Sequence, residues 1–520
     1  MAKVTLKTLG RNSLVAALAE IWRVVSRFIL TPLIIGKLGL EGYGVWTLVF
    51  SVAAYVSMAN ASFGLAYTKF TAECMQAKEY DRLSRIVGSG MVGIGSIAMV
   101  GLLGAVVFGE SIMAALQVPA ALIPDASVAL TIVLVVLVLR MSVGCCHEIL
   151  SGLQRMDITS RLAIIGSIVE FCVSVPLIFN DWGLVGLAVG HLAGYGSNNF
   201  MAYYYVRKLA PELRVSPFRM SREGFRLMAS VGGKFQILMG VNTVVMHGAK
   251  FVISVVLGPT WVGVYNLADR LLELGRAASA AIVAPLMPAF ADSQARGDKD
   301  QERVLLLKGS KADGLVGGGS LAFLAVFAPW VVFIWTGESV QEAGWALQVM
   351  AFGDGMFVLT SVVSSNLRAR GQVRLEMTTA LMSGFIGIGS MFPLMELWGF
   401  QGAVGARLLA QVIAASWYLR AFFRVSGLPL SEYLAGTRIL RILALLVSAV
   451  VISGLGSRLL EIPSVGVPER WQAVIQVSAW GLVYGVVVLV GAWKFVVDEE
   501  ERVRLRGFVG KVKRKLGLAE

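Results

Sequence analysis

The sequence is poor in charged residues. Only 15% of its 520 residues are Asp, Glu, Lys or Arg, whereas a soluble globular chain carries about 25%. Hydrophobic residues make up 56% of the chain, and the mean hydropathy is +0.73. So little charge excludes a water-soluble globular protein and predicts that lipid surrounds most of the surface.

Residues that bind metals or perform catalysis are also scarce. The chain has three histidines and four cysteines, and none of them has the spacing of a zinc site or a catalytic triad. There is no nucleophile elbow, no Walker motif, no HExxH and no paired-carboxylate loop, and the loops are too short for a catalytic domain. We therefore expect no enzyme activity, no metal and no cofactor. The residues concerned are His147, His191, His247, Cys74, Cys145, Cys146 and Cys172.

Long apolar runs, by contrast, are abundant. A helix that crosses a bilayer needs about 20 mostly apolar residues, and barrel strands are half as long and alternate. The sequence therefore predicts an all-α integral membrane protein with about fourteen transmembrane helices. They lie near residues 12–36, 44–68, 84–108, 126–150, 160–180, 183–206, 228–256, 261–290, 312–336, 343–366, 376–397, 400–423, 440–461 and 471–495.

Lys and Arg are distributed unequally between the two sides of this predicted bundle. The segments on the side of the N-terminus hold more than thirty basic residues, whereas the opposite loops hold Lys37, Arg458 and Arg470. Basic loops stay in the cytoplasm, so we predict a multi-pass inner (plasma) membrane protein with both termini cytoplasmic. The net charge of +13 then faces an anionic leaflet, not a nucleic acid. The basic tail 502–516 fits either an interfacial helix or a solvated tail.

A short motif occurs twice in the chain. Residues 38–48 (LGLEGYGVWTL) match residues 257–267 (LGPTWVGVYNL) at an offset of 219, and WGLVG at 182–186 matches WGFQG at 398–402 at an offset of 216. This offset covers six predicted helices, an even number, so both copies have the same orientation in the membrane. The sequence thus predicts two parallel-repeat six-helix lobes plus two extra C-terminal helices.

The predicted organisation follows from this repeat. Glycine-rich stretches such as 88–90 and 317–319 follow no predicted strand, so we interpret them as helix-packing sites and not as phosphate loops. The predicted parts are an N-terminal six-helix lobe (1–206), a cytoplasmic linker (207–227), a C-terminal six-helix lobe (228–424), helices thirteen and fourteen (425–495) and a basic amphipathic cytoplasmic tail (496–520).

Several charged residues fall inside the predicted spans. A charge at bilayer depth costs at least about 2.5 kcal/mol, so each is a candidate functional residue. Arginine suits a phosphate because its planar fork donates two hydrogen bonds at once. The candidate substrate-binding cations are Arg23, Arg27, Arg140, Lys250, Arg270, Arg276 and Arg407. The candidate ion-coupling groups or charge partners are Glu20, Glu170, Asp269, Glu273 and Asp354.

The same residues also fit a purely structural interpretation. Glu20 with Arg23, and Glu273 with Arg276, are spaced to form ion pairs along one helix face. Such pairs would hold helices in place without touching a ligand. The sequence leaves both interpretations open.

Four short motifs resemble the multidrug/oligosaccharidyl-lipid/polysaccharide (MOP) exporter superfamily, specifically its branch of polysaccharide and O-antigen (Wzx-like) flippases. They are residues 38–46, 150–155 (LSGLQR), 263–271 (GVYNLADRL) and 288–290 (PAF), and the likeness covers roughly residues 10–425. The resemblance implies alternating access and transfer of an undecaprenyl-pyrophosphate-linked oligosaccharide from the inner to the outer leaflet, for lipopolysaccharide or another polysaccharide. It places Arg23, Arg27, Lys250, Arg270 and Arg276 on the cavity wall.

Other functions stay compatible with the same motifs. The two extra helices resemble the lipid II flippase branch, and the fold also serves cation-coupled multidrug antiporters. A drug antiporter would favour an acidic cavity, whereas the cations are in excess here. A non-transporting scaffold of an envelope synthesis complex is a further alternative. The expected partners are membrane lipid, the polyprenyl-linked substrate and a glycan polymerase complex.

Overall fold

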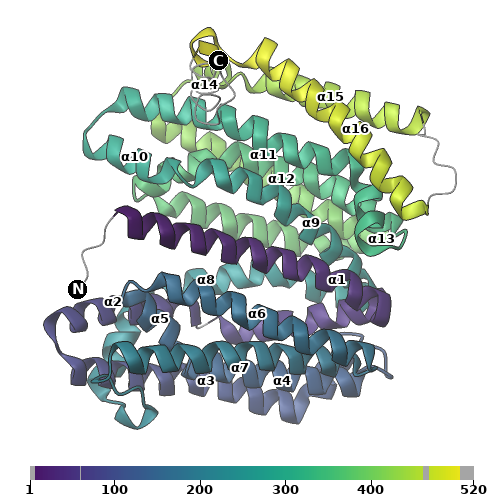
Figure 1. Ribbon diagram of the computed structural model, residues 1–520. Helices are drawn as coiled ribbons and strands as arrows, with labels where there is room; N and C mark the ends of the chain where they lie inside the picture. Colours follow the sequence, from purple (N-terminus) through teal and green to yellow (C-terminus); the bar gives the residue numbers. More distant parts are fainter. Residues whose placement is uncertain (1–5, 59, 461–467, 504–520) are drawn as a thin grey trace, which may run out of the picture. The chain divides into compact units, whose positions relative to one another are not determined.

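The computed structural model describes residues 6–58, 60–460 and 468–503. These residues form helices joined by short turns and contain no strand, which confirms the predicted all-α class (Figure 1). The first helices are α1 (Leu6–Ser57), α2 (Asn60–Ala77), α3 (Tyr80–Ala115), α4 (Ile123–Ser142), α5 (Cys145–Gly152), α6 (Met156–Phe179), α7 (Gly183–Leu209), η1 (Pro217–Arg219), α8 (Arg222–Leu257) and α9 (Pro259–Val283). They are followed by α10 (Leu286–Ala295), α11 (Lys299–Thr336), α12 (Gln341–Ala369), α13 (Val373–Ser426), α14 (Leu430–Thr437), α15 (Ile439–Leu459), α16 (Glu469–Gly491) and η2 (Ala492–Val496).

Two of these helices, α1 and α13, each contain a non-helical break and correspond to two predicted membrane spans. In α1 the backbone is non-helical at Gly39 (φ 69°), between the first and second predicted spans. In α13 it is non-helical at Trp398 and Gly399 (φ 55°), between the eleventh and twelfth. The corresponding glycines of the repeat, Gly258 (φ 92°) and Gly183 (φ 52°), also have a positive φ, which glycine adopts without steric cost. Ten helical segments in the described ranges are long and apolar enough to cross a membrane, and the count of fourteen stays a prediction.

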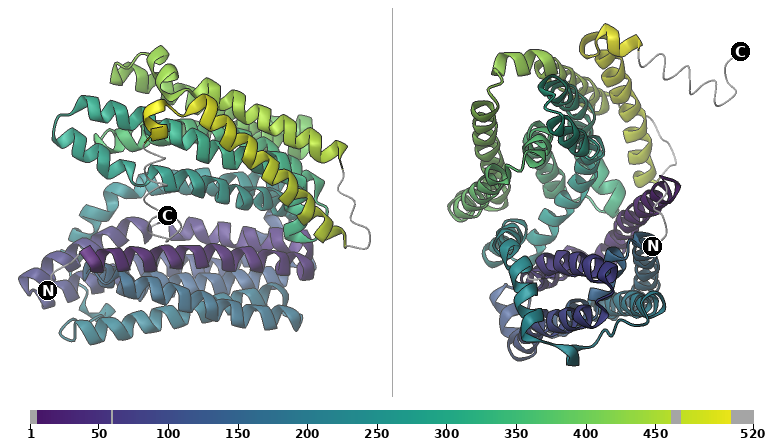
Figure 2. Two further views of the ribbon diagram at one scale, coloured as in Figure 1. Left: turned by 45° about the horizontal axis from the view of Figure 1, so that its top comes forward. Right: turned by 90° about the vertical axis from the view of Figure 1, so that its left-hand side faces the viewer.

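The chain divides into two compact units, Met1–Asn266 and Leu267–Glu520. In the first unit α6 lies along α7, α3 lies along α4, and α8 packs against α2 and α3 (Figures 1 and 2). The predicted linker 207–227 is held against the start of α3: Arg219 is 2.6 Å from the Asp81 carboxylate, and the Ser221 amide donates to the Ser89 hydroxyl. The six-helix lobe boundaries themselves stay predictions.

In the second unit α11 lies along α12, and α12 packs on α13 (Figure 1). Helices α15 and α16 both pack along α11, where Gly314 and Gly318 bring the backbone close to the side chains of α15. The glycines of α11 are therefore packing sites, as the sequence predicted. The segment that follows η2 is held against α11 by the buried Lys311. The Lys311 ammonium lies 2.8 Å from Asp498 and 2.7 Å from Glu501.

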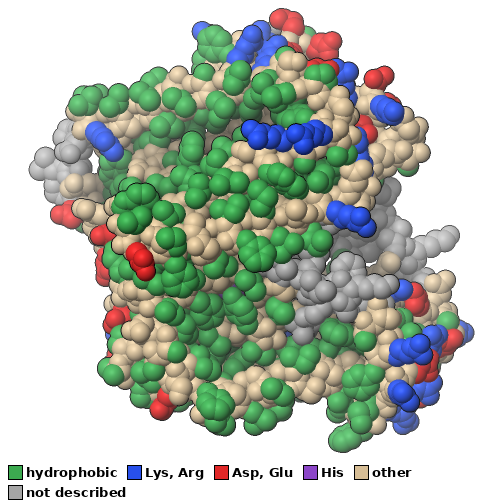
Figure 3. Space-filling model, turned by 180° about the vertical axis from the view of Figure 1, so that it is seen from behind, with side chains coloured by type: hydrophobic (Ala, Val, Ile, Leu, Met, Phe, Trp, Pro, Cys, Tyr) green, Lys and Arg blue, Asp and Glu red, His purple; other side chains and the backbone are tan. Residues whose placement is uncertain are grey.

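Both units expose large apolar side chains along helix flanks. Figure 3 shows broad hydrophobic areas on one face, with Lys, Arg, Asp and Glu gathered toward its margins. Exposed apolar areas of this size would be unstable in water and are expected next to lipid. Examples from α3 are Val100, Leu103, Val106, Val107 and Phe108, and from α15 Leu440, Leu443, Val447 and Leu455.

The two copies of the repeated motif pack against each other inside the first unit. A Cβ atom on Gly44 would lie 1.9 Å from the Pro259 carbonyl oxygen, and one on Gly263 would lie 2.5 Å from the Leu40 carbonyl oxygen. Pro259 follows Leu40 by the same 219 residues that separate Gly263 from Gly44. The contact is therefore reciprocal, and each copy uses its glycine to admit the backbone of the other.

Candidate functional site

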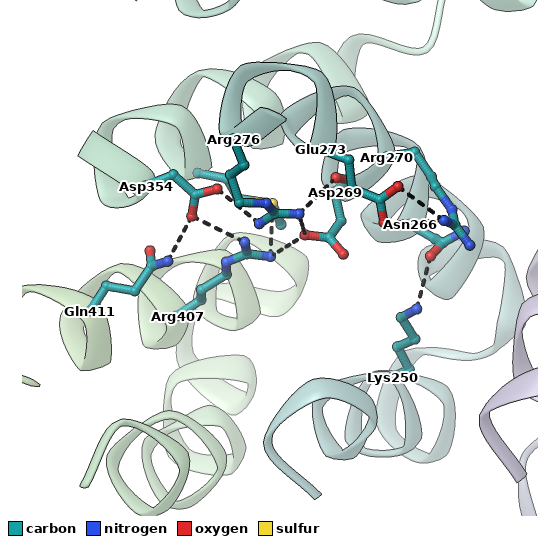
Figure 4. A network of polar contacts seen from close by, with 10 residues as sticks. Lys250, Asn266, Asp269, Arg270, Glu273, Arg276, Asp354, Arg407 and Gln411 are labelled. Atoms are coloured by element: carbon teal, nitrogen blue, oxygen red, sulfur yellow. Dashed lines mark hydrogen bonds and ion pairs between the residues drawn. The ribbon is translucent and has the colours of Figure 1, made fainter. Parts of the chain in front are cut away.

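The second unit contains a network of two arginines and two aspartates contributed by three helices. Arg276 of α9 binds the Asp354 carboxylate of α12 at 2.9 Å. It also binds the Asp269 carboxylate, seven residues earlier on α9, at 3.2 Å. Arg407 of α13 binds the same two carboxylates, at 3.0 Å for Asp269 and 3.2 Å for Asp354. The Gln411 amide adds a bond of 2.7 Å to Asp354 (Figure 4).

This network is balanced in formal charge and centred on one buried residue, since Arg276, Asp269 and Arg407 are partly exposed. Asp354 is only 1% exposed, so its charge depends on the two guanidinium groups that flank it. Because each arginine forks between two carboxylates, the network fixes the positions of α9, α12 and α13 relative to one another. A phosphate would have to compete with Asp269 and Asp354 for these guanidinium groups.

Arg270, on the same helix, has a different environment. Its guanidinium is 3.1 Å from the Glu273 carboxylate, and the two side chains are 35% and 51% exposed. The sequence left Glu273 as a partner for Arg276, but Glu273 pairs with Arg270, three residues earlier, and Arg276 turns to Asp354. Because both side chains are partly exposed, a ligand can approach Arg270.

In the first unit the candidate cation Lys250 lies in a buried polar group. Its ammonium donates to the Asn266 amide oxygen at 2.9 Å, and Lys250 itself is 8% exposed. The Asn266 amide nitrogen in turn donates to the Tyr43 hydroxyl at 2.6 Å and to Thr47 at 3.2 Å. Asn266 follows Thr47 by 219 residues, so equivalent positions of the repeat contact each other directly.

A second polar group of the first unit joins α6 and α7. The His191 ring lies 2.9 Å from the Glu170 carboxylate and meets the ring of Phe50 edge-on, with 5.1 Å between centroids. The Tyr195 ring meets the His191 ring at a tilt of 59°, with 4.9 Å between centroids, and Arg140 lies over the Tyr195 ring at 5.7 Å. The candidates Glu170 and Arg140 are thus brought into one cluster.

Sequence reasoning missed His191, because a histidine without metal-ligand spacing carries no local signal. A signal was available in the repeat. Arg407 follows His191 by 216 residues, and Asp269 follows Phe50 by 219, the two offsets of the repeated motifs. The contact between Phe50 and His191 in the first unit therefore corresponds to the ion pair between Asp269 and Arg407 in the second.

Not every candidate can be placed. The side chains of Glu20, Arg23 and Arg27 lie outside the part of the chain that the structure describes, although the backbone of all three belongs to α1. Across the described ranges no group of three or more His, Cys, Asp or Glu side chains is arranged to hold a metal ion.

An open apolar cavity of about 440 Å³ lies on the second unit. Its walls come from α9, α11 and α16, and the Tyr484 hydroxyl at its edge donates to the Gly319 carbonyl at 2.8 Å. The walls consist of hydrocarbon and glycine backbone, so the cavity suits an alkyl or isoprenoid chain. Residues that line it include Leu274, Leu315, Phe323, Leu324, Val488 and Leu489.

The sequence model of one protein family matches residues 9–294, more than half of the chain, and is described as "Polysaccharide biosynthesis protein". The chain belongs to this polysaccharide biosynthesis protein family. None of the proteins with curated annotation matches it. The match includes α1 to α9 and confirms the polysaccharide-branch resemblance of the sequence motifs.

Solved structures with a similar fold are transporters of the MOP superfamily. A lipid II flippase MurJ in an inward closed conformation superposes with a TM-score of 0.74 at 13% identity, covering 93% of this chain and 100% of that one. An inward-facing multidrug resistance MATE family transporter of the MOP superfamily gives 0.67 at 15% identity, covering 79% and 95%. The MATE multidrug transporter DinF-BH gives 0.60 at 14% identity, covering 81% and 96%. At these identities the likeness establishes the fold of this polysaccharide biosynthesis family member.

Proposed function

We propose that this protein is a flippase that moves a polyprenyl-pyrophosphate-linked oligosaccharide from the inner to the outer leaflet by alternating access. The observation that carries the proposal is the family match over residues 9–294, combined with a transporter fold. The substrate we infer is the undecaprenyl-pyrophosphate carrier of O-antigen-type glycans. In this proposal the protein lies in the inner membrane with both termini in the cytoplasm, and a glycan polymerase complex receives the product.

The cations support an anionic headgroup. Arg270 is the described candidate that a ligand reaches most easily, because both it and its partner Glu273 are partly exposed. In the proposal Arg270 is the pyrophosphate-binding residue of the second unit, and Lys250, Arg23 and Arg27 are the candidate cations of the first. A pyrophosphate crossing hydrocarbon alone would meet a prohibitive solvation cost, and cationic side chains in a wet cavity remove most of it.

Arg276 and Arg407 have a different proposed role. Their guanidinium groups already bind Asp269 and Asp354, so they hold α9, α12 and α13 in register. In the proposal this network keeps the second unit rigid during the conformational change of alternating access.

The apolar cavity between α9, α11 and α16 is the proposed site for part of the polyprenyl tail. A cavity of about 440 Å³ holds only a short segment of a long isoprenoid, and the rest stays in the bilayer. Burying each CH₂ group contributes about 0.8 kcal/mol, but lipid already provides that environment. The cavity therefore contributes orientation rather than affinity.

A lipid II flippase is the second candidate function. The specific observation in its favour is the fold likeness to MurJ, which spans 93% of this chain and so includes the C-terminal helices. Lipid II carries the same polyprenyl-pyrophosphate group, so the proposed roles of Arg270 and the apolar cavity apply unchanged. The two candidates differ in the sugar.

The test is the fate of lipid-linked sugars in cells that lack this protein. We expect a polyprenyl-pyrophosphate oligosaccharide to accumulate on the cytoplasmic leaflet, with recovery on adding wild type but not Arg270→Ala. Mass spectrometry of the extracted lipid identifies the sugar. Accumulation of lipid II alone would favour the second candidate, and no accumulation with an unchanged cell surface would contradict both.

Arg296→Ala is the matched control. Arg296 is an exposed arginine that pairs with Asp292 on α10, outside the candidate cations. We expect the Arg296→Ala variant to restore transport as fully as wild type does. Equal loss in Arg296→Ala and Arg270→Ala would point to a general effect of charge and contradict the assignment of Arg270.

A further inference from the structure

Asp313 of α11 is a fully buried carboxyl outside both polar networks described above. Its exposure is 0%, and the Ser361 hydroxyl of α12 donates to its Oδ2 atom. Within the described part of the chain its Oδ1 atom has no hydrogen-bond partner, and neither has the hydroxyl of Ser279 on α9, which is also 0% exposed. Buried polar atoms without partners are rare and call for an explanation.

The side chains of Asp313 and Ser279 meet at Gly317. A Cβ atom on Gly317, one turn after Asp313, would lie 2.6 Å from Asp313 Oδ1 and 2.8 Å from the Ser279 Cβ atom. Glycine at 317 therefore lets the carboxyl and the serine pack closely against α11, in a helix where alanine would be favoured by about 1 kcal/mol. The carboxyl thus lies in a tightly packed site between α9, α11 and α12.

The other copy of the repeat has no such group. The residues 219 positions before Asp313 and Gly317 are Ile94 and Ala98, which are 1% and 0% exposed. The serine is common to both copies, since Ser142 precedes Ser361 by 219 residues. The second copy thus has a carboxyl and a glycine where the first copy has an ordinary apolar core.

The charges around Asp313 are already used by other partners. On its own helix the Lys311 ammonium binds Asp498 and Glu501, and Arg438 at the start of α15 binds Asp498 as well. The polar neighbours of Asp313 include Ser361, whose hydroxyl donates to it, and Ser279, and the phenol of Tyr433 on α14 lies within reach of its charge. Arg276 on α9 and Asp354 on α12 bind each other.

We propose that Asp313, Ser279 and Ser361 form a proton-binding site in which the carboxyl is neutral at physiological pH. An ionised carboxylate with only hydroxyl partners would pay the full cost of leaving water, and a proton from solvent removes that cost. The proton resides on Oδ1, the oxygen beside Gly317, while Oδ2 accepts a hydrogen bond from the Ser361 hydroxyl.

The proton leaves to water only when α9, α11 and α12 separate enough to hydrate Asp313. Protonation therefore favours the packed arrangement of these helices. The equilibrium between packed and opened arrangements shifts by up to tenfold per pH unit for one coupled proton.

The test is infrared spectroscopy of the purified protein in lipid nanodiscs at neutral pH. We expect wild type to show the carbonyl band of a neutral carboxyl that Asp313→Asn lacks. Asp292→Asn, the same change at an exposed ion-paired carboxylate, should leave the band unchanged. An identical band in wild type and Asp313→Asn would overturn the proposal.

Gly317→Ala tests the site without removing the carboxyl and serves if Asp313→Asn does not fold. Its methyl group would press on Oδ1, so we expect a shifted carbonyl band, and an unshifted band would contradict the assignment. Thermal unfolding at constant ionic strength, with sodium or choline as the cation, distinguishes a proton site from a sodium site. If sodium raised the unfolding temperature of wild type but not that of Asp313→Asn, the site would bind sodium, and this would overturn the proton assignment. These measurements need no substrate, so their outcome is separate from the flippase proposal.

Discussion

In the first unit the ring of Phe50 meets the ring of His191 edge-on, with 5.1 Å between centroids. In the second unit the corresponding residues, Asp269 and Arg407, form an ion pair at 3.0 Å. The same contrast recurs where Ile94 corresponds to Asp313. Duplicated helices thus keep their contacts while the chemistry diverges, and among the described side chains the second unit holds more buried charge. Removing one partner of a buried charge pair destabilises a protein strongly, so mutations can measure the difference between the two units.

The largest effect should come from the charge network of the second unit. Asp354→Ala leaves Arg276 and Arg407 sharing one carboxylate, and breaking a buried pair of this kind costs about 3–5 kcal/mol. We expect a large drop in the thermal unfolding temperature of the purified protein. The double variant Arg276→Met with Asp354→Leu keeps the charges balanced and should lose less. A single variant as stable as the double one would contradict the network.

The reciprocal contact of the two motif copies should be the next most sensitive. Gly44→Ala places a Cβ atom 1.9 Å from the Pro259 carbonyl and Gly263→Ala one 2.5 Å from the Leu40 carbonyl. Overpacking costs about 1–3 kcal/mol, so both variants should destabilise, Gly44→Ala the more. Gly36→Ala, with no atom within 4 Å of its Cβ, is the control in the same helix. Comparable losses in all three would mean that close backbone approach is not the cause.

A smaller loss is expected in the first unit. His191→Leu removes the partner at 2.9 Å from the Glu170 carboxylate, and a partly buried group left without that bond costs about 1–2 kcal/mol. Chemical denaturation of His191→Leu should therefore show less destabilisation than that of Asp354→Ala. His191→Gln retains a donor and should recover part of the loss. If His191→Leu were the more damaging of the two, the contrast between the units would be reversed.

The smallest effect concerns the C-terminal helices, which lie outside the repeat. The Lys311 ammonium lowers the pKa of Asp498 below its ordinary value of 3.8. A lowered carboxyl pKa adds stability that is present above pH 3.8 and lost as the pH falls through the folded-state value. Asp498→Asn should cost under about 1 kcal/mol at pH 7, because the group is half-exposed. The difference from wild type in thermal unfolding should shrink as the pH falls below 3.8. A constant difference would contradict the pairing.

Much of the fold followed from the sequence because lipid and helix geometry leave few alternatives. Apolar runs of about 20 residues can satisfy their backbone only as helices, so the all-α class was predictable. The breaks at Gly39 and Gly399 were marked by the repeated glycines themselves. The docking of 207–227 onto α3 was not predictable, because the contact of Arg219 with Asp81 joins residues 138 positions apart.

The sequence by itself determined which residues carry charge into the helices and that the chain repeats at an offset of 216–219. The tertiary structure decided what those charges do. Arg270 stays partly exposed while Arg276, six residues later, is bound between two aspartates, and no helical spacing distinguishes the two. It also singled out Asp313, which local sequence reasoning passed over. The physical reason is that periodicity fixes a side chain's direction from its own helix, whereas its partners and its exposure depend on which other helices pack there.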